Sequence, residues 1–304
     1  MGITKRVKVG LDETRMLILG VQILLGFALR SPFEDAFEAL SLEQRWMTAA
    51  ALMLMVVTVA LLIAPGTFHR LAENGNDTGR LLWLVTRVAD VALLPLGAAI
   101  GLAVLIGCER IFGRGAGIAA GALFTALALG IWYGAGHLRR TQAGQRERAN
   151  AARLVAVVQK TPLHDRIDHM LTEARVILPG AQALLGFQLA IVLTKTFDAL
   201  PMSSKALHGI SLGCIALAVI LLIAPAAYHR IVCAGEDKEE VHSVGSWFIT
   251  AATVPLALGL AGDVYVVIAK IADSHAVGAA AAAASLVLLV AFWHALPLVM
   301  RWRR

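Results

Sequence analysis

Ionisable side chains occur in two motifs that are each present twice in this sequence, at an interval of 160 residues. One motif is Glu-x-Arg, and the other is His-Arg preceded by Pro-x-x-x. Together they comprise Glu13, Arg15, His69, Arg70, Glu173, Arg175, His229 and Arg230. A histidine changes its charge near neutral pH, so a carboxylate beside it can form a proton-accepting gate. The same groups can instead form an ion-paired clasp between the first two helices of each copy.

Other polar residues lie within apolar stretches. Gln22 and Gln182 are a repeated pair, and we expect both amides to face the interior of a helix bundle, where they bond neighbouring helices or line a polar pathway. Arg87 and Asp90 are three residues apart, which places them on one helix face and predicts a buried ion pair. Asp263 has no acidic counterpart in the other copy. Asp90 and Asp263 are therefore the best carboxylates to test for an ion-binding site.

Motifs of metalloproteins and soluble enzymes are absent from the sequence. The three cysteines, Cys108, Cys214 and Cys233, lack the spacing of zinc ligands or of a disulfide framework. The chain also has no HExxH, nucleophile-elbow or Walker lysine motif. We therefore predict no metal site, no cofactor and no enzymatic activity.

The elements that must hold the polar residues are long apolar blocks. The chain of 304 residues is 58% hydrophobic and 16% charged, with a mean hydropathy of +0.73. Blocks of about 18 apolar residues cross the hydrocarbon core as helices, because lipid offers the backbone no other hydrogen-bond partner. We predict an all-α integral membrane bundle of about eight helices. Their expected ranges are roughly 11–30, 46–66, 80–107, 114–136, 171–194, 205–226, 243–270 and 275–299.

The blocks form two copies of one four-helix unit. Leu61-Leu-Ile-Ala-Pro65 recurs as Leu221-Leu-Ile-Ala-Pro225, and Gly20-Val-Gln22 recurs as Gly180-Ala-Gln182. A constant offset without gaps indicates an internal duplication. We assign a first four-helix repeat to residues 1–138, a basic cytoplasmic connector to 139–164 and a second four-helix repeat to 165–304.

The distribution of charge predicts the orientation. Lysine and arginine are concentrated in the N-terminal tail, the connector and the C-terminal end, whereas the loop after the first helix is acidic. The positive-inside rule then places both termini on the cytoplasmic side of the plasma (inner) membrane. Because each copy has an even number of spans, the copies face the same way, related by a pseudo-two-fold axis along the membrane normal. The net charge of +6 is therefore explained by the membrane orientation and not by nucleic-acid binding. Anionic lipid is a candidate partner of the basic connector.

The repeated motifs also resemble a known family. Glu-x-Arg, Gly-x-Gln-x-Leu-x-x-Phe and Leu-Leu-Ile-Ala-Pro-x-x-x-His-Arg, taken in this order, are similar to the pattern of an uncharacterised family of short bacterial membrane proteins. Members of that family are typically single four-helix units and often carry the automatic label of sodium:proton antiporter. The resemblance covers both halves, so this chain looks like a fused tandem version. It implies that single-unit relatives pair, whereas here both partners belong to one chain.

Two functions are compatible with these observations. The first is translocation of protons or small cations by a multi-pass membrane protein, with the Glu/Arg/His motifs as its cytoplasmic gate. The alternative is a non-transporting membrane scaffold that binds lipid or a partner membrane protein. Association of the chain with itself is compatible with either. A water-filled cavity that reaches Gln22 and Gln182 would favour transport, and a dry core of glycine and alanine would favour the scaffold.

Overall fold

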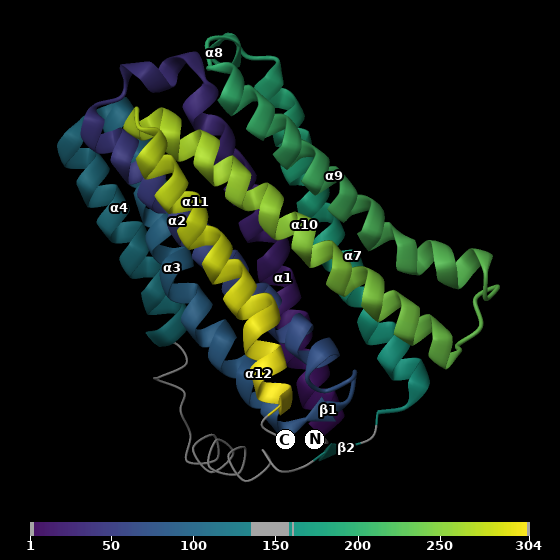
Figure 1. The fold of residues 1–304 in the computed structure, drawn as a ribbon. Coiled ribbons are helices and arrows are strands. Elements are labelled where there is room, and N and C mark those ends of the chain that lie inside the picture. Colours follow the sequence, from purple (N-terminus) through teal and green to yellow (C-terminus); the bar gives the residue numbers. More distant parts are fainter. Residues whose placement is uncertain (1–2, 135–157, 160, 303–304) are drawn as a thin grey trace.

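The computed structural model describes residues 3–134, 158–159 and 161–302, and it is built from helices (Figure 1). Within the described residues, eight helical segments are long and apolar enough to cross a membrane. This finding confirms the predicted all-α class and the predicted number of helices that are long enough to cross a membrane. The segments are α1 (Ile3–Arg30), α2 (Leu42–Leu71), α3 (Gly79–Phe112), α4 (Arg114–Leu129), α7 (Leu163–Val192), α9 (Met202–Ile231), α10 (Glu239–Ala272), and α11 (His275–Val290) continued by α12 (Leu296–Trp302).

Short elements connect these helices. The π turns η3 (Gly130–Gly134) and η4 (Ala291–Ala295) extend α4 and α11. The loops at the end opposite the two termini contain the 3₁₀ turns η1 (Ser31–Phe33) and η2 (Asp35–Ala39) and the single turn α8 (Lys195–Asp198). At the terminal end, β1 (Asp77–Thr78) pairs in antiparallel fashion with β2 (Val158–Gln159). This pair joins the turn after α2 to the residues that precede α7.

The first helix of each repeat begins earlier than expected. We predicted starts near residues 11 and 171, but α1 begins at Ile3 and α7 at Leu163. Hydropathy detects only the apolar part of a helix. The helix itself can continue through polar turns that face water or other helices. The Glu-x-Arg motifs consequently lie inside their helices and not at the ends.

Helices α1 and α7 lie side by side and run in the same direction. Near one end, Lys8 Nζ lies 3.4 Å from Asp168 Oδ2. Near the other end, the rings of Phe27 and Phe187 are 4.7 Å apart. Both pairs join positions that are 160 residues apart, so equivalent residues of the two repeats face each other along the pair of helices. Two antiparallel helices could not make both contacts.

The turn after the second helix of each repeat has the same conformation in both copies. Asn74 and Gly75 have φ of 49° and 76°, and Ala234 and Gly235 have φ of 52° and 83°. The amide of Gly75 donates to the carbonyl of His69 over 2.9 Å, and the amide of Gly235 donates to His229 over 3.0 Å. A positive φ is uncommon at residues other than glycine, such as Asn74 and Ala234, so this shared geometry supports the duplication.

The two repeats occupy unequal places in the bundle. In both α2 and α10, 72% of the most apolar stretch is buried, compared with 33% in α9 and 28% in α3. Helix α2 is central because the last segment of the second repeat packs on it, with Trp293 Nε1 donating to the carbonyl of Ala60 over 3.0 Å. Tyr133, at the position equivalent to Trp293, instead bonds to the carbonyl of Asp90 on α3. Identical motifs therefore lie in different surroundings.

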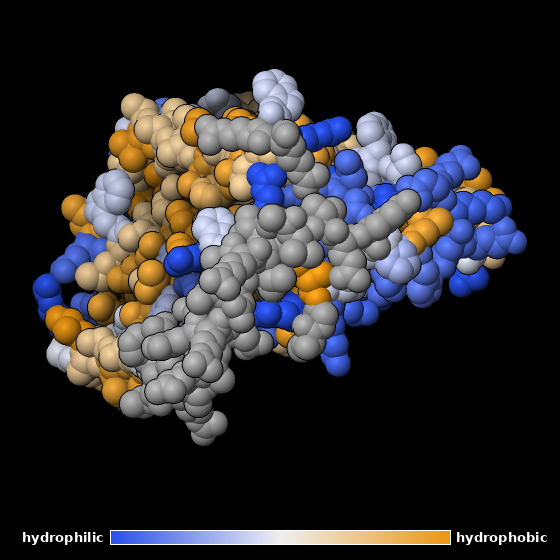
Figure 2. Space-filling view, turned by 90° about the horizontal axis from the view of Figure 1, so that it is seen from below, coloured by the Kyte–Doolittle hydropathy of each residue, from blue (hydrophilic) through white to orange (hydrophobic). Residues whose placement is uncertain are grey.

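Polar and apolar surfaces separate as expected for a bundle in a membrane. Figure 2 shows the molecule from the end that carries both termini, with hydrophobic residues along its flank. Hydrophilic residues gather on this end and around the projecting turn between α9 and α10. That turn carries Glu236, Asp237 and Lys238, and the Lys238 ammonium lowers the pKa of the Glu236 carboxyl.

Candidate functional site

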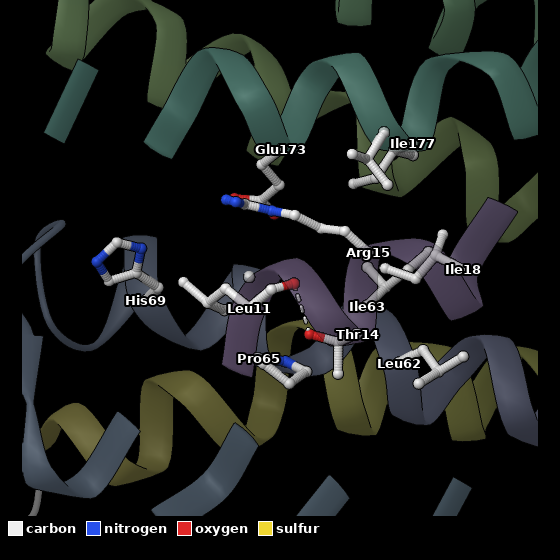
Figure 3. Close-up of a pocket in the computed structure, with 12 residues that line it drawn as sticks. Leu11, Thr14, Arg15, Ile18, Leu62, Ile63, Pro65, His69, Glu173 and Ile177 are labelled. Atoms are coloured by element: carbon white, nitrogen blue, oxygen red, sulfur yellow. Dashed lines mark hydrogen bonds between the residues drawn. The ribbon is translucent and has the colours of Figure 1, made fainter. Parts of the chain in front are cut away.

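Four residues of the repeated motifs, Arg15, His69, Arg70 and Glu173, meet in one buried cluster between α1, α2 and α7. Figure 3 shows Arg15, His69 and Glu173 of this cluster. Arg70 forms an ion pair with Glu173, and their side chains are 3% and 9% exposed. Arg15 and His69 are also buried. Arg15 bonds to the carbonyl of His169 over 3.1 Å and to Asp12 over 2.6 Å. The cluster therefore combines side chains of both repeats.

The predicted contacts within each copy are confirmed only for Arg15, which lies near His69 of its own repeat, and are wrong for Glu13 and for the second repeat. We expected Glu13 and Arg15 to meet His69 and Arg70 in the first repeat, with an equal cluster in the second. Instead, the carboxylate that faces Arg70 comes from the other repeat. The remaining four residues lie outside the buried cluster, since Glu13, Arg175 and Arg230 are exposed and His229 is partly exposed. The reason is that α2 is central to the bundle, whereas its counterpart α9 is peripheral.

A small cavity adjoins the buried cluster. It has a volume of about 20 Å³ and is lined by Arg15, His69 and Glu173 together with apolar side chains. A space of this size holds about one water molecule. It can therefore solvate a proton near Glu173, but it cannot admit a hydrated metal cation.

The two repeated glutamines also have different environments. Gln22 is fully buried, packs against Gly180, and neither of its amide atoms has a hydrogen-bond partner among the described residues. Gln182 is exposed on the outside of the bundle, so the prediction that both glutamines face the interior is confirmed for Gln22 and wrong for Gln182. The α1–α7 contact is not symmetric at this depth, and only one of two equivalent side chains fits between the helices.

The predicted buried ion pair on α3 does not occur. Arg87 is exposed, with its guanidinium carbon 6.0 Å from the centre of the Trp83 ring, and Asp90 is partly exposed. In the described part of the chain these two residues make no ion pair with each other. The physical reason is the peripheral position of α3, which lets a long arginine side chain extend outward along the helix.

Asp263 lies in a second buried polar group, formed by the second repeat alone. Gln188 Nε2 donates to Asp263 Oδ2 over 2.7 Å, and His208 Nδ1 lies 3.7 Å from Asp263 Oδ1. The other ring nitrogen of His208, Nε2, bonds to the carbonyl of Gln188 over 3.1 Å. A carbonyl is only an acceptor, so His208 Nε2 carries a proton and a neutral His208 directs a lone pair at the carboxylate. Two acceptors facing each other favour the binding of one proton between them.

Sequence reasoning missed the two partners of Asp263. Gln188 and His208 occupy positions equivalent to Ala28 and Thr48. Because the two copies differ at both positions, a comparison of the repeats does not identify them. The signal that could have found them is simpler, since each is a strongly polar residue within an apolar helix. Such residues are costly in a membrane unless they are partnered or functional.

An open depression lies at the end of the bundle opposite the termini, near this second group. It has a volume of about 600 Å³, and its lining includes Glu38, Lys270 and Ser204. Val266 lines both this depression and a cavity of about 10 Å³ beside Asp263 and His208. Ser204 is one helical turn from His208 on α9. The depression therefore ends close to the buried carboxylate.

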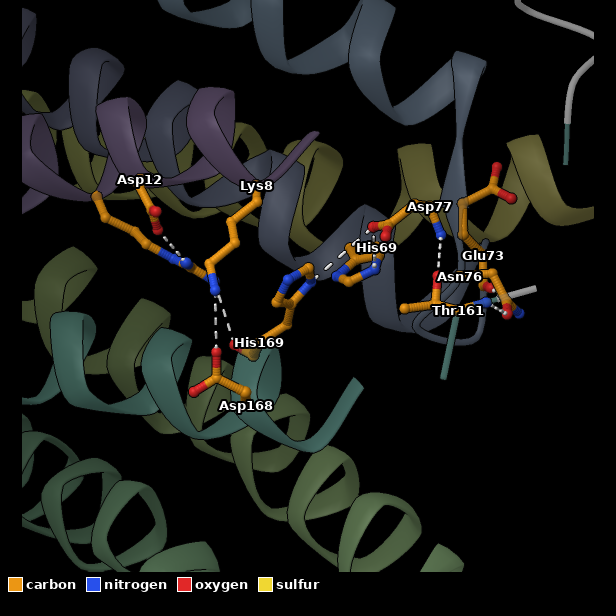
Figure 4. Close-up of polar contacts among 10 residues, drawn as sticks. Lys8, Asp12, His69, Glu73, Asn76, Asp77, Thr161, Asp168 and His169 are labelled. Carbon is orange, nitrogen blue, oxygen red and sulfur yellow. Dashed lines mark hydrogen bonds and ion pairs between the residues drawn. The ribbon is translucent and has the colours of Figure 1, made fainter. Parts of the chain in front are cut away.

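A third buried group lies at the terminal end of the bundle (Figure 4). His69 Nε2 and His169 Nδ1 lie 3.8 Å and 3.9 Å from Asp77 Oδ1. Burial raises the pKa of the Asp77 carboxyl, and His169 and the Thr161 hydroxyl offset part of that rise. The backbone amide of Asp77 donates to Thr161 Oγ1 over 2.9 Å, which fixes the turn beside β2.

Asp77 and His169 were not predicted as site residues. Asp77 could have been found, because the offset of 160 carries it onto Asp237. His169 could not, because its counterpart is Val9 and its contact with Asp77 joins the two repeats. The prediction of no metal site considered spacing along the chain, and such spacing gives no information about groups assembled from distant segments.

Comparison with known proteins shows the family but no activity. The model of a family described as "Family of unknown function (DUF6328)" matches residues 4–135 and again residues 159–297. No curated protein and no solved structure matches the chain. The two matches support the internal duplication. They do not support the label of sodium:proton antiporter, because the description of the family states no function.

Proposed function

Since the chain belongs to the family of unknown function DUF6328 as two consecutive copies of its unit, we propose that it is a membrane transport protein that moves protons along a path that begins within the second repeat and continues along the contact between the two repeats. The observation that carries the proposal is a series of buried polar groups at successive depths. Asp263, with Gln188 and His208, lies nearest the open depression. Gln22 follows, and Glu173, with Arg15 and Arg70, lies towards the terminal end.

The spacing of these groups suits a relay with intermediate water. On α7, Glu173 and Gln188 are separated by about 22 Å, and Gly180, which contacts Gln22, lies between them. Steps of about 10–12 Å exceed one hydrogen bond, so water or side-chain movement must complete the path. The cavities beside Glu173 and Asp263 have the size of single waters. This size favours a proton over a hydrated cation.

The orientation of the protein is part of the proposal. We propose a position in the plasma (inner) membrane with both termini cytoplasmic and a pseudo-two-fold axis along the membrane normal. The matching contacts along α1 and α7 and the location of both termini at one end support this arrangement (Figure 1). Glu173 would then lie towards the cytoplasm, and the depression near Asp263 would open to the other side.

Proton flux into liposomes tests the proposal. Purified protein is reconstituted with a pH-sensitive dye inside, and a potassium diffusion potential drives proton entry. We expect flux above that of protein-free liposomes and a loss of about a hundredfold in Asp263→Asn, which keeps the shape but removes the acid. Asp90→Asn is the control, because Asp90 is the other deep carboxylate and lies outside the proposed path.

Two results would refute the proposal. Wild-type liposomes that match protein-free liposomes would exclude transport of protons. Equal flux in wild type and Asp263→Asn would exclude this path. Replacement of sodium by an impermeant cation during the assay distinguishes proton transport from exchange for a small cation, since only exchange depends on sodium.

A membrane scaffold is the second candidate function. The small volume of the interior cavities favours it, because no described cavity of more than about 20 Å³ adjoins Gln22 or Glu173. Its proposed partners are anionic lipid at the connector, another membrane protein or a second copy of this chain. The connector residues 139–157 and 160 lie outside the described residues. Retention of anionic lipid by wild type, with no proton flux, would support this function.

A further inference from the structure

We propose that His69, Asp77 and His169 bind one divalent transition-metal ion of the zinc class at the terminal end of the bundle. This site uses atoms from both repeats, since His69 and Asp77 belong to the first and His169 to the second. It does not depend on transport, and it extends beyond the proposed function.

The spacing of the three groups distinguishes an ion from direct hydrogen bonds. One ligand atom from each of the three residues can be chosen so that all lie within 4.8 Å of one another. The two nitrogen-to-oxygen distances of 3.8 and 3.9 Å exceed the roughly 2.7–3.2 Å of a hydrogen bond. In a tetrahedral zinc site with bonds of about 2.0–2.1 Å, neighbouring ligand atoms are about 3.3 Å apart. Each nitrogen-to-oxygen pair would have to close by about half an ångström, and the two histidine nitrogens, which lie within 4.8 Å of each other, by up to about 1.5 Å.

The ligand atoms are buried and lack ordinary partners. His69, Asp77 and His169 are at most 4% exposed. Among the described residues, His69 Nε2, His169 Nδ1 and both carboxylate oxygens of Asp77 make no hydrogen bond of ordinary length and angle, although the hydroxyls of Thr161 and Thr4 lie near the carboxylate. Buried polar atoms are nearly always paired. Three such groups that converge on one point are explained by an ion between them.

The chemistry of the donors sets the class of metal. Two imidazole nitrogens and one carboxylate oxygen suit zinc and its first-row neighbours, whereas calcium and magnesium prefer oxygen ligands alone. Three protein ligands leave a fourth position for water. The metal would link α7 of the second repeat to the end of α2 and the turn that follows it.

The charges around the site permit a dication. Arg70 is paired with Glu173, and Arg15 is paired with Asp12. Lys8, about two turns before Arg15 on α1, is paired with Asp168. Asp77 supplies a negative charge directly at the site. Each of these three cations therefore has a carboxylate partner of its own.

The second repeat provides an internal comparison. His229 Nε2 lies 3.8 Å from Asp237 Oδ1, as in the first repeat, but these side chains are 21% and 35% exposed. The other oxygen of Asp237 lies 2.5 Å from His164 Nδ1, and the side chain of His164 is 77% exposed. This group is open to solvent, and its carboxylate already has a direct partner. We therefore expect one ion per chain.

Metal content of the purified full-length protein tests the site. The protein carries a tag without histidine, is treated with a chelator, dialysed, and then titrated with zinc alone in detergent. We expect about one zinc per chain, and the affinity should fall more than about a hundredfold in His69→Ala and in His169→Ala. His229→Ala is the matched control and should retain wild-type affinity. Cobalt, used as a second probe, should give the absorption of a tetrahedral site in wild type.

A melting experiment separates loss of the site from loss of the fold. Zinc should raise the melting temperature of wild type and His229→Ala but not of His169→Asn, which should still elute as a folded particle without metal. Less than about one tenth of a zinc per wild-type chain would overturn the proposal. Equal loss of zinc in His229→Ala and His169→Ala would also overturn it. Neither readout uses proton flux, so failure of the transport proposal leaves this result unaffected.

Discussion

Glu173 and Glu13 occupy equivalent positions on α7 and α1, yet Glu173 is buried against Arg70 and Glu13 is exposed. The same division separates Arg15, which is buried, from Arg175, which is exposed. At the scale of residues, duplication therefore preserved the side chains while the surroundings changed. A repeated motif of this kind need not form two repeated sites.

The buried ion pair should be sensitive to the loss of one partner. Glu173→Gln leaves the Arg70 charge in a buried place without a counter-charge, and we expect a loss of about 3 kcal/mol in the free energy of unfolding. Glu13→Gln is the matched control, and its effect should stay within about 0.5 kcal/mol because the side chain is exposed. Unfolding in mixed detergent micelles measures both values.

A double variant completes this test. Replacement of both partners, in Glu173→Gln with Arg70→Met, removes the uncompensated charge and should restore part of the lost stability. Equal destabilisation by Glu13→Gln and Glu173→Gln would show that the ion pair does not distinguish the two repeats.

Helices α1 and α7 pack closely because small residues lie at their contact. A methyl group added at Gly180 would lie 1.6 Å from Gln22 Oε1 and 2.8 Å from Gln22 Cβ. At the equivalent Gly20, no described atom lies within 4 Å of an added methyl group. At the scale of elements, the contact between equivalent helices is therefore asymmetric.

Alanine at these two glycines should have opposite effects. Gly180→Ala should lower the melting temperature, because Gln22 cannot avoid the methyl group by moving its amide end alone. Gly20→Ala should leave the melting temperature unchanged or raise it. At an unobstructed position in a helix, alanine is more favourable than glycine by about 0.5–1 kcal/mol. Thermal unfolding of both variants in the same detergent checks this prediction. Similar losses in the two variants would contradict the observed packing.

At the scale of the whole molecule, the arrangement predicts which loops share a side of the membrane. Glu34 and Lys195 belong to loops at the end opposite the termini, and Glu236 lies in the α9–α10 turn on the terminal side. We expect an impermeant maleimide to label Glu34→Cys and Lys195→Cys from outside cells, and Glu236→Cys only in inverted vesicles. The native Cys108, Cys214 and Cys233 must first be replaced. Labelling of Glu34→Cys and Glu236→Cys from one side would exclude the proposed topology.

Sequence reasoning succeeded where the signal is local or periodic. Apolar length predicts the eight spans, and a constant register predicts the duplication, because both depend on residues close in sequence or on direct comparison of the copies. It failed for contacts between repeats, such as Arg70 with Glu173 and Asp77 with His169. Nothing in the register indicates that α2 becomes central and α9 peripheral, since that choice depends on where the last helix of the second repeat packs.

Half-length forms of this protein could not assemble the same buried groups, because His169 comes from the second repeat. A homodimer of the first half would still offer an acid, Glu13, in place of Glu173, but it would place Val9 where His169 stands and Ala103 where Asp263 stands. Two identical subunits must place the same residue on both sides of their axis. Fusion removes that obligation, so each half can acquire side chains that its twin would not tolerate, and neither half can then replace the other.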